Sequence, residues 1–310
     1  MSKSCPRVVV PSWLPSARAR MLPVRRGRAM LLLVVLVACL CGVATGAQEG
    51  TPRRIISFIP AVTEMLFALG AGDRVVAVGS FDKYPAEINK LPRVGALLDP
   101  DLERIISLKP DLVTVYGSQT DLRAQLERAQ VPLFLYSHAE LSDVTKTILD
   151  LGARVGRTER ARELTGGIER KVEAVRQRVS SQRRPRTLIV FGRESAALRG
   201  IYASGGYGFI HDMVTAAGGD NVFADLKQQA VQATTELIIA RRPDVILELR
   251  AEPLNEEQLV REINAWKPLS SVPAVRNGRV HIIADLRTVI PGPRVAEGVD
   301  VIARVLHGAR

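Results

Sequence analysis

Cysteine is almost absent from this chain, and the few cysteines present lie close to one end. The 310 residues include three cysteines, Cys5, Cys39 and Cys41, all within the first 41 positions. The rest of the chain therefore has no disulfide of its own, no thiolate ligands for zinc and no cysteine nucleophile. A body of about 260 residues is long enough to bury a core without such covalent support.

Histidine and the known local catalytic motifs are scarce as well. The four histidines stand at positions 138, 211, 281 and 307, and this wide spacing predicts no site for a bare metal ion. The sequence contains no Gly-x-Ser-x-Gly, no His-Glu-x-x-His and no Walker loop. We therefore expect no catalytic residues and no cofactor. An enzyme remains the alternative, because acid–base sites can be assembled from residues without a local motif.

The chain also lacks the strongly basic body that is typical of nucleic-acid-binding proteins. Residues 1–50 hold seven Lys or Arg against one Glu, a net charge of +6 out of the +11 of the whole sequence, which leaves +5. Such a modest excess is a weak indication of nucleic acid, so we expect no nucleic-acid partner.

What the N-terminus does have is the pattern of a targeting segment. A basic stretch that ends at Arg28 precedes residues 29–38, which are apolar but too few to span a bilayer. A small-residue cleavage site, Thr45-Gly46-Ala47, follows. Residues 1–47 are therefore predicted to be a leader, and the protein is predicted to be periplasmic or otherwise extracytoplasmic.

The type of leader stays open. The segment Leu36-Val37-Ala38-Cys39 resembles a bacterial lipobox, in which Cys39 would be lipidated and become the first residue of a lipid-anchored protein. Signal peptide and lipoprotein leader are equally compatible with the residues, and an uncleaved anchor is a third alternative. Translation from Met21 instead of Met1 would give a leader of more ordinary length.

Two segments 133 positions apart have nearly the same pattern. Residues 101–113 and 234–246 each begin with an N-cap residue, carry a glutamate two places later and reach a Pro-Asp step before an apolar run. Each is predicted to be a short helix followed by a buried strand. Residues 63–77 and 209–224 are also alike, at an offset of 147. The sequence therefore predicts an α/β fold of two similar lobes with parallel sheets.

The predicted lobes, residues 53–156 and 185–310, are joined by a segment with helical periodicity, residues 157–184. Within it, residues 158–182 would form a helix roughly 37 Å long, enough to cross from one lobe to the other. An ordinary surface helix of one lobe is the alternative, and Gly166-Gly167 allows a kink. Apolar residues recur every three or four positions, at Leu164, Ile168, Val172, Val175 and Val179.

The order of short motifs along the chain resembles that of ABC-importer substrate-binding proteins for vitamin B12 and ferric siderophores, the metal-chelate receptors with a helical backbone. The likeness is greatest to vitamin B12-binding proteins and covers roughly residues 53–308. The motifs, in order, are Ser57-Phe58-Ile59-Pro60, Tyr84-Pro85, Leu102-Glu103-Arg104-Ile105, Gly218-Gly219-Asp220-Asn221, Trp266-Lys267-Pro268-Leu269 and Gly292-Pro293-Arg294.

This resemblance implies two Rossmann-like lobes joined by one long helix, with the ligand held between them and little domain closure. It also implies that a glutamate on each lobe docks into arginine pockets of a dimeric ABC permease, and these glutamates match Glu103 and Glu236. A charged pair of this kind sets the orientation and on-rate of a partner. The alternative is that each glutamate only complements its helix dipole. We expect the protein to act as a monomer.

Ligand contacts are expected at the carboxyl ends of the strands, where open α/β lobes bind their ligands. By the resemblance, Phe81, Leu97 and Tyr116 match aromatic pocket positions, although tryptophan would be expected in place of Leu97. An aromatic expected near Ala230 is also missing. The candidate residues are Pro60, Ala61, Phe81, Tyr84, Leu97, Tyr116 and Gly117 in the first lobe, and Arg193, Tyr202, Tyr207 and Arg287 in the second.

Aromatic walls and arginines together predict the kind of cargo. Aromatic and apolar side chains suit a corrin or a planar chelate, and arginines suit carboxylates or phosphate. We therefore expect an exported binding protein that takes cobalamin or another corrinoid, or alternatively a ferric siderophore or haem, to an ABC permease.

Overall fold

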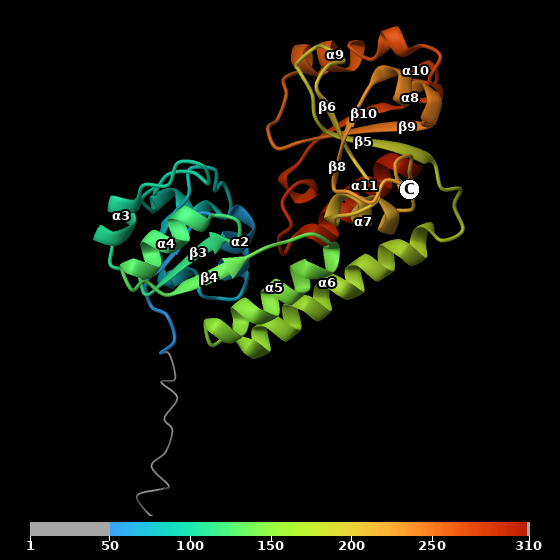
Figure 1. Ribbon diagram of the computed structural model, residues 1–310. Helices are drawn as coiled ribbons and strands as arrows, with labels where there is room; N and C mark the ends of the chain where they lie inside the picture. The colour runs from blue at the N-terminus through green and yellow to red at the C-terminus, as the bar shows by residue number, and fades with distance from the viewer. Residues whose placement is uncertain (1–49, 309–310) are drawn as a thin grey trace, which may run out of the picture. The chain divides into compact units, whose positions relative to one another are not determined.

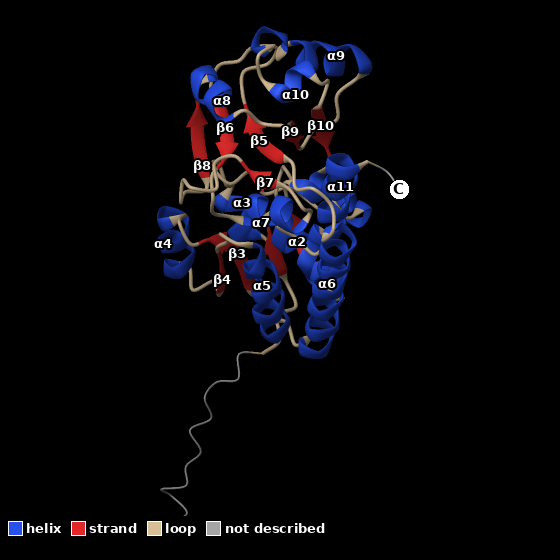
Figure 2. Cartoon of the chain, turned by 90° about the vertical axis from the view of Figure 1, so that its right-hand side faces the viewer, coloured by secondary structure: helices blue, strands red, loops and turns tan. Residues whose placement is uncertain are grey.

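Two β-sheets flanked by helices form the part of the chain that the structure describes (Figures 1 and 2). This computed structural model describes residues 50–308, so the predicted leader and Cys39 lie outside it. Among residues 50–308, none of the helices combines the length and the apolar character that a membrane crossing requires.

The first sheet has four parallel strands in the order β2-β1-β3-β4. Its central strand β1 is completely buried, because short apolar β-branched segments suit a sheet that is covered on both faces. The elements of this lobe are β1 (Ile55–Ser57), α2 (Pro60–Ala68), η1 (Gly72–Arg74), β2 (Val75–Val78), η2 (Ala86–Lys90), α3 (Leu102–Ser107), β3 (Leu112–Tyr116), α4 (Thr120–Arg128) and β4 (Leu133–Tyr136).

The second sheet has the order β10-β9-β5-β6-β8, with the two-residue strand β7 beside β5. This sheet contains both parallel and antiparallel strand pairs. The first half of the second lobe comprises β5 (Arg186–Gly192), β6 (Ile201–Ser204), α7 (Phe209–Ala216), β7 (Asp220–Asn221) and β8 (Ala230–Ala233). The second half of this lobe comprises α8 (Thr235–Arg241), β9 (Val245–Arg250), α9 (Glu256–Asn264), η3 (Lys267–Leu269), α10 (Pro273–Arg276), β10 (Val280–Ala284), η4 (Leu286–Thr288) and α11 (Val295–His307).

The expectation of two wholly parallel sheets is wrong for one strand of the second sheet. Strand β6 runs antiparallel to both β5 and β8. The connection between β5 and β6 contains no helix, and a parallel pair needs a crossover of a dozen or more residues. The short connection therefore returns the chain as a hairpin.

The predicted repeat is present in the structure, including its turns. Helices α3 and α8 are each followed by a parallel strand, β3 and β9. Asp101 and Thr234 cap the two helices by accepting a hydrogen bond from the backbone N–H three residues on. Each helix is followed by a left-handed residue, Lys109 with φ 47° and Arg242 with φ 48°. Sequence and structure thus agree on one unit used twice.

Hydrogen bonds that anchor the two units are duplicated as well. The Arg54 guanidinium donates to the Leu108 carbonyl at the end of α3, and the Arg186 guanidinium donates to the Arg241 carbonyl at the end of α8. These arginines stabilise the negative ends of the helix dipoles and fix each helix against the start of a strand.

The segment between the two sheets in the sequence forms a helical hairpin of α5 (Leu141–Arg154) and α6 (Thr158–Val179), which runs below both sheets in Figure 1. The predicted long helix is therefore confirmed; it ends at Val179 and continues through Gly166-Gly167. Its buried face carries Ile168, Val172, Val175 and Val179, as the periodicity predicted.

Helix α6 is shared between the lobes. It packs against α5, α7 and α11. One hydrophobic cluster runs from β1 and α2 through α5 and α6 to α7, β9 and α11. A surface helix of a single lobe would bury its stripe on one side only, so the alternative interpretation does not hold.

Candidate functional site

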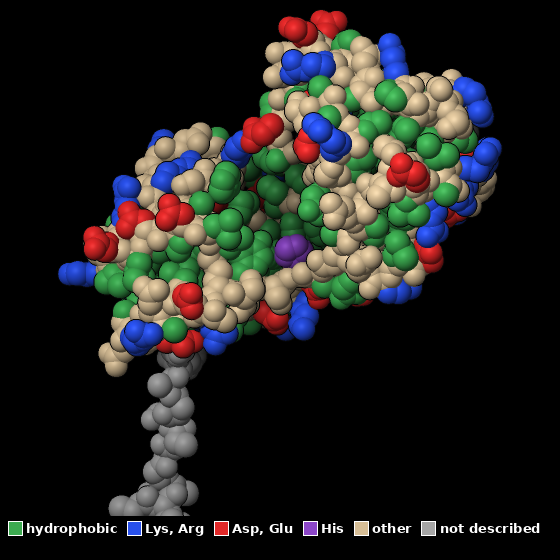
Figure 3. Space-filling view, turned by 45° about the horizontal axis from the view of Figure 1, so that its top comes forward, with side chains coloured by type: hydrophobic (Ala, Val, Ile, Leu, Met, Phe, Trp, Pro, Cys, Tyr) green, Lys and Arg blue, Asp and Glu red, His purple; other side chains and the backbone are tan. Residues whose placement is uncertain are grey.

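The loops that follow the parallel strands of both sheets approach one another. The ammonium of Lys83, in the loop after β2, pairs with the carboxylate of Glu252, which follows β9. Figure 3 shows a hollow with many hydrophobic side chains on its walls and a histidine at its base. The carboxyl ends of the strands therefore meet at a hollow, as expected for ligand sites in open α/β lobes.

Two adjoining cavities belong to the second-lobe side of this region. The first, about 230 Å³, is lined by His138, Phe191, Tyr207 and Phe209 among others. The second, about 450 Å³, shares Phe191, Phe209 and Ile210 with the first and extends to Arg250 and Glu252. The shared aromatic residues make the two cavities one continuous apolar surface with charge at one end.

An aromatic cluster forms the wall between the first lobe and these cavities. Tyr116 and Tyr136 are register partners at the ends of β3 and β4, and their ring centroids are 5.1 Å apart. His138 stacks on Tyr136 at 5.4 Å and meets the ring of Phe209 edge-on at 5.7 Å. Because Phe209 begins α7, the cluster joins aromatic groups of both lobes.

Burial keeps this wall uncharged. It raises the pKa of the Tyr116 and Tyr136 phenols above the ordinary value and lowers the pKa of His138, against an opposing effect of the Asp143 charge on His138. Both phenols and the imidazole are therefore neutral at neutral pH.

A glycine turn before α7 positions further residues of the cavity lining. A Cβ atom on Gly205 would lie 2.2 Å from the Gln228 carbonyl oxygen, and one on Gly206 would lie 2.0 Å from that of Ala224. The N–H groups of Gly205 and Gly206 donate to the carbonyls of Gln229 and Leu226. The turn thus places Tyr207 and Phe209 and leaves neither of these two N–H groups for an anion.

A second contact between the lobes lies behind Tyr84. The guanidinium of Arg294 donates two hydrogen bonds to the buried carboxylate of Glu64, at 2.6 and 2.9 Å. The same guanidinium lies 3.9 Å from the centroid of the Tyr84 ring. This ion pair joins α2 to the start of α11, and removing one partner would leave a buried charge uncompensated.

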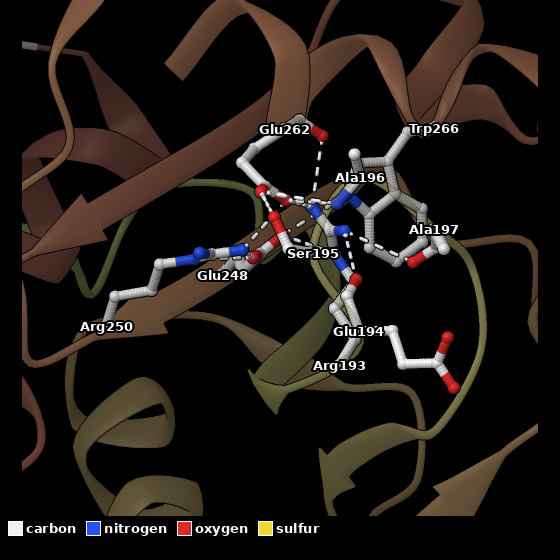
Figure 4. Close-up of polar contacts among 9 residues, drawn as sticks. All are labelled: Arg193, Glu194, Ser195, Ala196, Ala197, Glu248, Arg250, Glu262 and Trp266. Carbon is white, nitrogen blue, oxygen red and sulfur yellow. Dashed lines mark hydrogen bonds and ion pairs between the residues drawn. The ribbon is translucent and has the colours of Figure 1, made fainter. Parts of the chain in front are cut away.

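Arg193, one of the predicted ligand contacts, is held inside the second lobe (Figure 4). Its side chain is fully buried and pairs with Glu248 at 3.0 Å and with Glu262 at 2.6 Å. The remaining guanidinium N–H groups donate to backbone carbonyls, and Trp266 packs 5.7 Å from the guanidinium. All donors of Arg193 are thus committed to the protein itself.

The same network brings a second arginine to the cavity. Glu248 and Glu262 both pair with Arg250, whose side chain is partly exposed and lines the larger cavity. Burial alone would raise the pKa of Glu262, but hydrogen bonds from Ser195 and Ala196 and the charges of Arg193 and Arg250 outweigh it and hold the pKa at about 2. Two carboxylates and two guanidinium groups therefore form a neutral cluster behind the cavity.

Most of the predicted contacts are found at the strand ends, but they do not form one surface. Phe81 is 68% exposed in the loop after β2, and Leu97 lines a groove of about 480 Å³ with Leu98 and Gln119. Pro60 and Ala61 begin α2, and the Gly117 N–H donates to the Tyr136 carbonyl. Only Tyr207 and Arg193 of the candidates line the two cavities described above.

Two candidates of the second lobe face elsewhere. Tyr202 is half-exposed on β6, and Arg287 pairs with Asp285 and Glu297. Arg287 lines a depression between α6 and α11 instead. The hydrogen bonds that Arg287 donates to the Asp285 carboxylate raise the pKa of Arg287, so its charge is permanent and already neutralised.

Sequence reasoning missed several cavity residues: His138, Phe191, Phe209 and Ile210. Phe191 and His138 stand close to strand ends, which is a usable signal. Nothing in the local sequence indicates that Phe209 and Ile210, at the start of a helix, meet them in space.

The two predicted docking glutamates are both exposed at equivalent positions. Glu103 and Glu236 are the second residues of α3 and α8, one on each lobe. The backbone N–H at the helix start, with the Thr234 hydroxyl, lowers the pKa of Glu236. Both side chains point out of the fold, so neither belongs to the cavities.

Two α/β lobes that share a long helix and enclose an apolar hollow at their strand ends define a two-lobed ligand receptor. Residues 55–285 match the family described as periplasmic binding protein, and the chain belongs to this family. The match spans three quarters of the sequence, so it covers both lobes.

Relatives and solved structures agree with this assignment. The chain is 30% identical over 261 residues to an uncharacterised ABC transporter substrate-binding lipoprotein of Bacillus subtilis, covering 83% of this chain and 80% of that one. It is 27% identical to a vitamin B12-binding protein of Yersinia pestis, over 82% of this chain and 85% of the relative.

The periplasmic haem-binding protein RhuT of Roseiflexus superposes with a TM-score of 0.71 at 27% identity, covering 83% of this chain and 99% of that structure. These relatives are transport proteins that act outside the cytoplasm, in agreement with the predicted export.

Proposed function

We propose that the protein captures a metal-chelate nutrient in the hollow between its lobes and delivers it to an ABC permease. A corrinoid is the first candidate ligand, and haem or a ferric siderophore is the second. The observation that supports this proposal is the aromatic lining formed by His138, Phe191, Tyr207 and Phe209, with the buried ring of Tyr136 stacked behind His138. Such walls suit a large, flat, partly apolar ligand better than a small polar nutrient.

Delivery would use the duplicated glutamates. Glu103 and Glu236 lie at equivalent points of two similar units, a geometry that fits a permease of two like subunits. A monomeric receptor with one acidic residue on each lobe would dock through complementary charge. Lipidation at Cys39 would keep the receptor at the membrane; this stays a prediction.

We propose binding without turnover. Within residues 50–308 the smaller cavity is lined by uncharged groups, and the charged side chains that line the larger cavity are paired with other side chains of the protein. Members of the family named above are substrate-binding proteins. An enzyme using the same hollow is therefore not favoured by any feature of the site.

An equilibrium titration tests the proposal. Trp266 is the only tryptophan beyond position 50 and contacts Glu248, which lines the larger cavity. We expect its fluorescence to be quenched in a saturable way by cyanocobalamin, haem or a ferric hydroxamate, and the recovered ligand to be chemically unchanged. Failure of all three to bind, or chemical conversion of the ligand, would contradict the proposal.

A further inference from the structure

His138 is the one described histidine that lines the cavities at the strand ends. It lies two residues beyond β4, between the ring of Tyr136 and the ring of Phe209. Its neighbours in the smaller cavity are Phe191 and Tyr207. The lining of this cavity is mostly apolar, with Ser204 and Gln229 as its other polar side chains besides Tyr207.

The imidazole is not committed to the protein. Its Nδ1 atom is buried and has no hydrogen-bond partner among residues 50–308. A buried polar atom without a partner costs about 1–3 kcal/mol, so it needs an explanation. By contrast, His307 contacts the Ala217 carbonyl, and His211 contacts the Asn221 amide. No hydrogen bond within residues 50–308 fixes the tautomer of His138. Because Nδ1 is buried, Nε2 is the nitrogen that a ligand could reach, and it can carry the lone pair when Nδ1 carries the proton.

The charge state of His138 also suits a metal ligand. Burial lowers the pKa of His138, so the ring is neutral at neutral pH. Neutral imidazole is the form that binds transition metals. The nearby Tyr207 phenol would have to lose a proton before it could serve the same purpose.

A bare ion would not be held here. No group of three or more His, Cys, Asp or Glu with the arrangement of a metal site occurs within the described residues. A single nitrogen donor can hold a metal only when other ligands already fill most of its coordination sphere. The flat aromatic walls around His138 fit a planar macrocycle that provides those other ligands.

We infer that His138 is an axial ligand for the metal of the captured chelate, which would be a metal macrocycle with one exchangeable axial position. This inference rests on the proposed function and narrows its ligand class. Ferric porphyrin and aquacobalamin share the required chemistry, because each carries a replaceable axial ligand. A ferric siderophore with all six positions filled does not share it.

Paired ligands with and without metal test the inference. The purified protein is titrated with ferric protoporphyrin, with metal-free protoporphyrin and with aquacobalamin, for the wild type and for His138→Ala. We expect His138→Ala to weaken the binding of at least one metal macrocycle by about tenfold or more. Binding of the metal-free porphyrin should stay within about twofold of the wild type, because its contacts with the walls are kept.

The visible spectrum and a control variant distinguish ligation of the metal by His138 from mere packing of the His138 side chain against the macrocycle. The visible spectrum of the bound macrocycle should change in His138→Ala and return when free imidazole is added. His281→Ala, which removes a histidine of β10 outside both cavities, should change neither affinity nor spectrum. If His138→Ala fails to fold, the visible spectrum of the macrocycle bound to the wild type still tests the inference, because axial ligation by His138 requires that spectrum to show nitrogen ligation of the metal.

Three results would overturn the inference: equal losses for metal-free and metal porphyrin, an unchanged spectrum in His138→Ala, or loss of the ligation signal in Tyr207→Phe alone. These differ from failure of the proposed function, in which wild-type protein binds no chelate. Binding of ferric hydroxamate only, with no macrocycle bound, would support the receptor and overturn axial ligation.

Discussion

Asp82 is a buried carboxyl group beside the exposed aromatic residues of the β2 loop. Its Oδ2 accepts a hydrogen bond from the Gly79 N–H, and its Oδ1 is buried without a partner. Burial is the main cause that raises the pKa of Asp82 to about 6, and the opposing effects of the Thr63 side chain, the Gly79 hydrogen bond and the Arg93 charge offset it only in part. The native state therefore holds this proton more tightly than the unfolded chain does.

This raised pKa predicts a pH-dependent effect of Asp82→Asn. The stability that protonated Asp82 contributes is present below about pH 4 and is lost as the pH rises through about 6. The amide stays neutral and keeps an acceptor for Gly79. We expect Asp82→Asn to raise the free energy of unfolding by on the order of 2 kcal/mol at pH 8 and by about zero at pH 4. Urea unfolding at both pH values measures this, and a gain that is the same at both would contradict it.

The sequence predicted the region of the cavities better than the residues that line them. Tyr116 ends the parallel strand β3 as expected but lines neither cavity, and Tyr207 lines the smaller cavity although it follows the antiparallel strand β6. Arg193 lines the larger cavity, but Glu248 and Glu262 neutralise it. That pairing depends on β9 and α9, which no local pattern places beside residue 193.

Two glycines in the helical hairpin differ in the space around them. A Cβ atom on Gly167 of α6 would meet nothing within 4 Å, whereas a Cβ atom on Gly152 of α5 would lie 2.4 Å from the Ala161 Cβ atom. Gly152 therefore lets α5 and α6 approach closely. Gly167 has no such role.

The contrast predicts opposite effects of the same substitution. Gly167→Ala should stabilise the protein by about 0.5–1 kcal/mol, because alanine is the better helix former. Gly152→Ala should destabilise it, because the added methyl group forces the two helices apart. Urea unfolding of both variants measures the effects, and a loss of stability in Gly167→Ala would contradict the account.

Helices α3 and α8 share an exposed isoleucine as well as an exposed glutamate. Three residues after Glu103 and Glu236, on the same helix face, lie Ile106 and Ile239, which are 41% and 42% exposed. An exposed isoleucine at the equivalent point of each lobe gives the two surfaces the same combination of charge and apolar area.

Charge reversal on these helices tests docking. If docking uses these residues, Glu103→Lys and Glu236→Lys should each lower ligand uptake into cells by roughly tenfold and together abolish it, because a cation would face a surface that is complementary to an acidic residue. Affinity for the ligand should be unchanged, since neither side chain lines the cavities. Glu169→Lys, which reverses an exposed charge on α6, is the matched control. Unimpaired uptake in the double variant would exclude docking through these residues.

The helices and strands that could be predicted are those whose sequence pattern lies within a few residues. The caps of α3 and α8, their Pro-Asp stops and the apolar stripe of α6 are all encoded within a few residues of each other. The antiparallel direction of β6 was not predicted. It follows from the short connection between β5 and β6, which has no room for a crossover helix, and the length of that connection is known only when the limits of both strands are known.

The molecule as a whole resists closure of one lobe on the other. A single hydrophobic cluster continues through α5 and α6 into both lobes, and the buried Glu64–Arg294 pair joins α2 to α11. A hinge motion would shear this core and separate a buried ion pair, each at a cost of several kcal/mol.

We therefore expect little movement of the lobes on ligand binding. Residues 50–310 contain no cysteine, so Ile106→Cys and Ile239→Cys allow specific labelling at one exposed point of each lobe. The distance between spin labels at these points should change by less than about 2 Å when a saturating chelate is added. A larger change would show that the continuous core does not act as a rigid connection.

We expect a metal chelate to bind in the hollow at the strand ends. Its metal is an anomalous scatterer, so a crystal of the complex locates it directly. We expect one strong peak within the cavity lined by His138, Phe191 and Tyr207. A peak elsewhere on the protein, or an occupied hollow that holds a metal-free molecule, would contradict it.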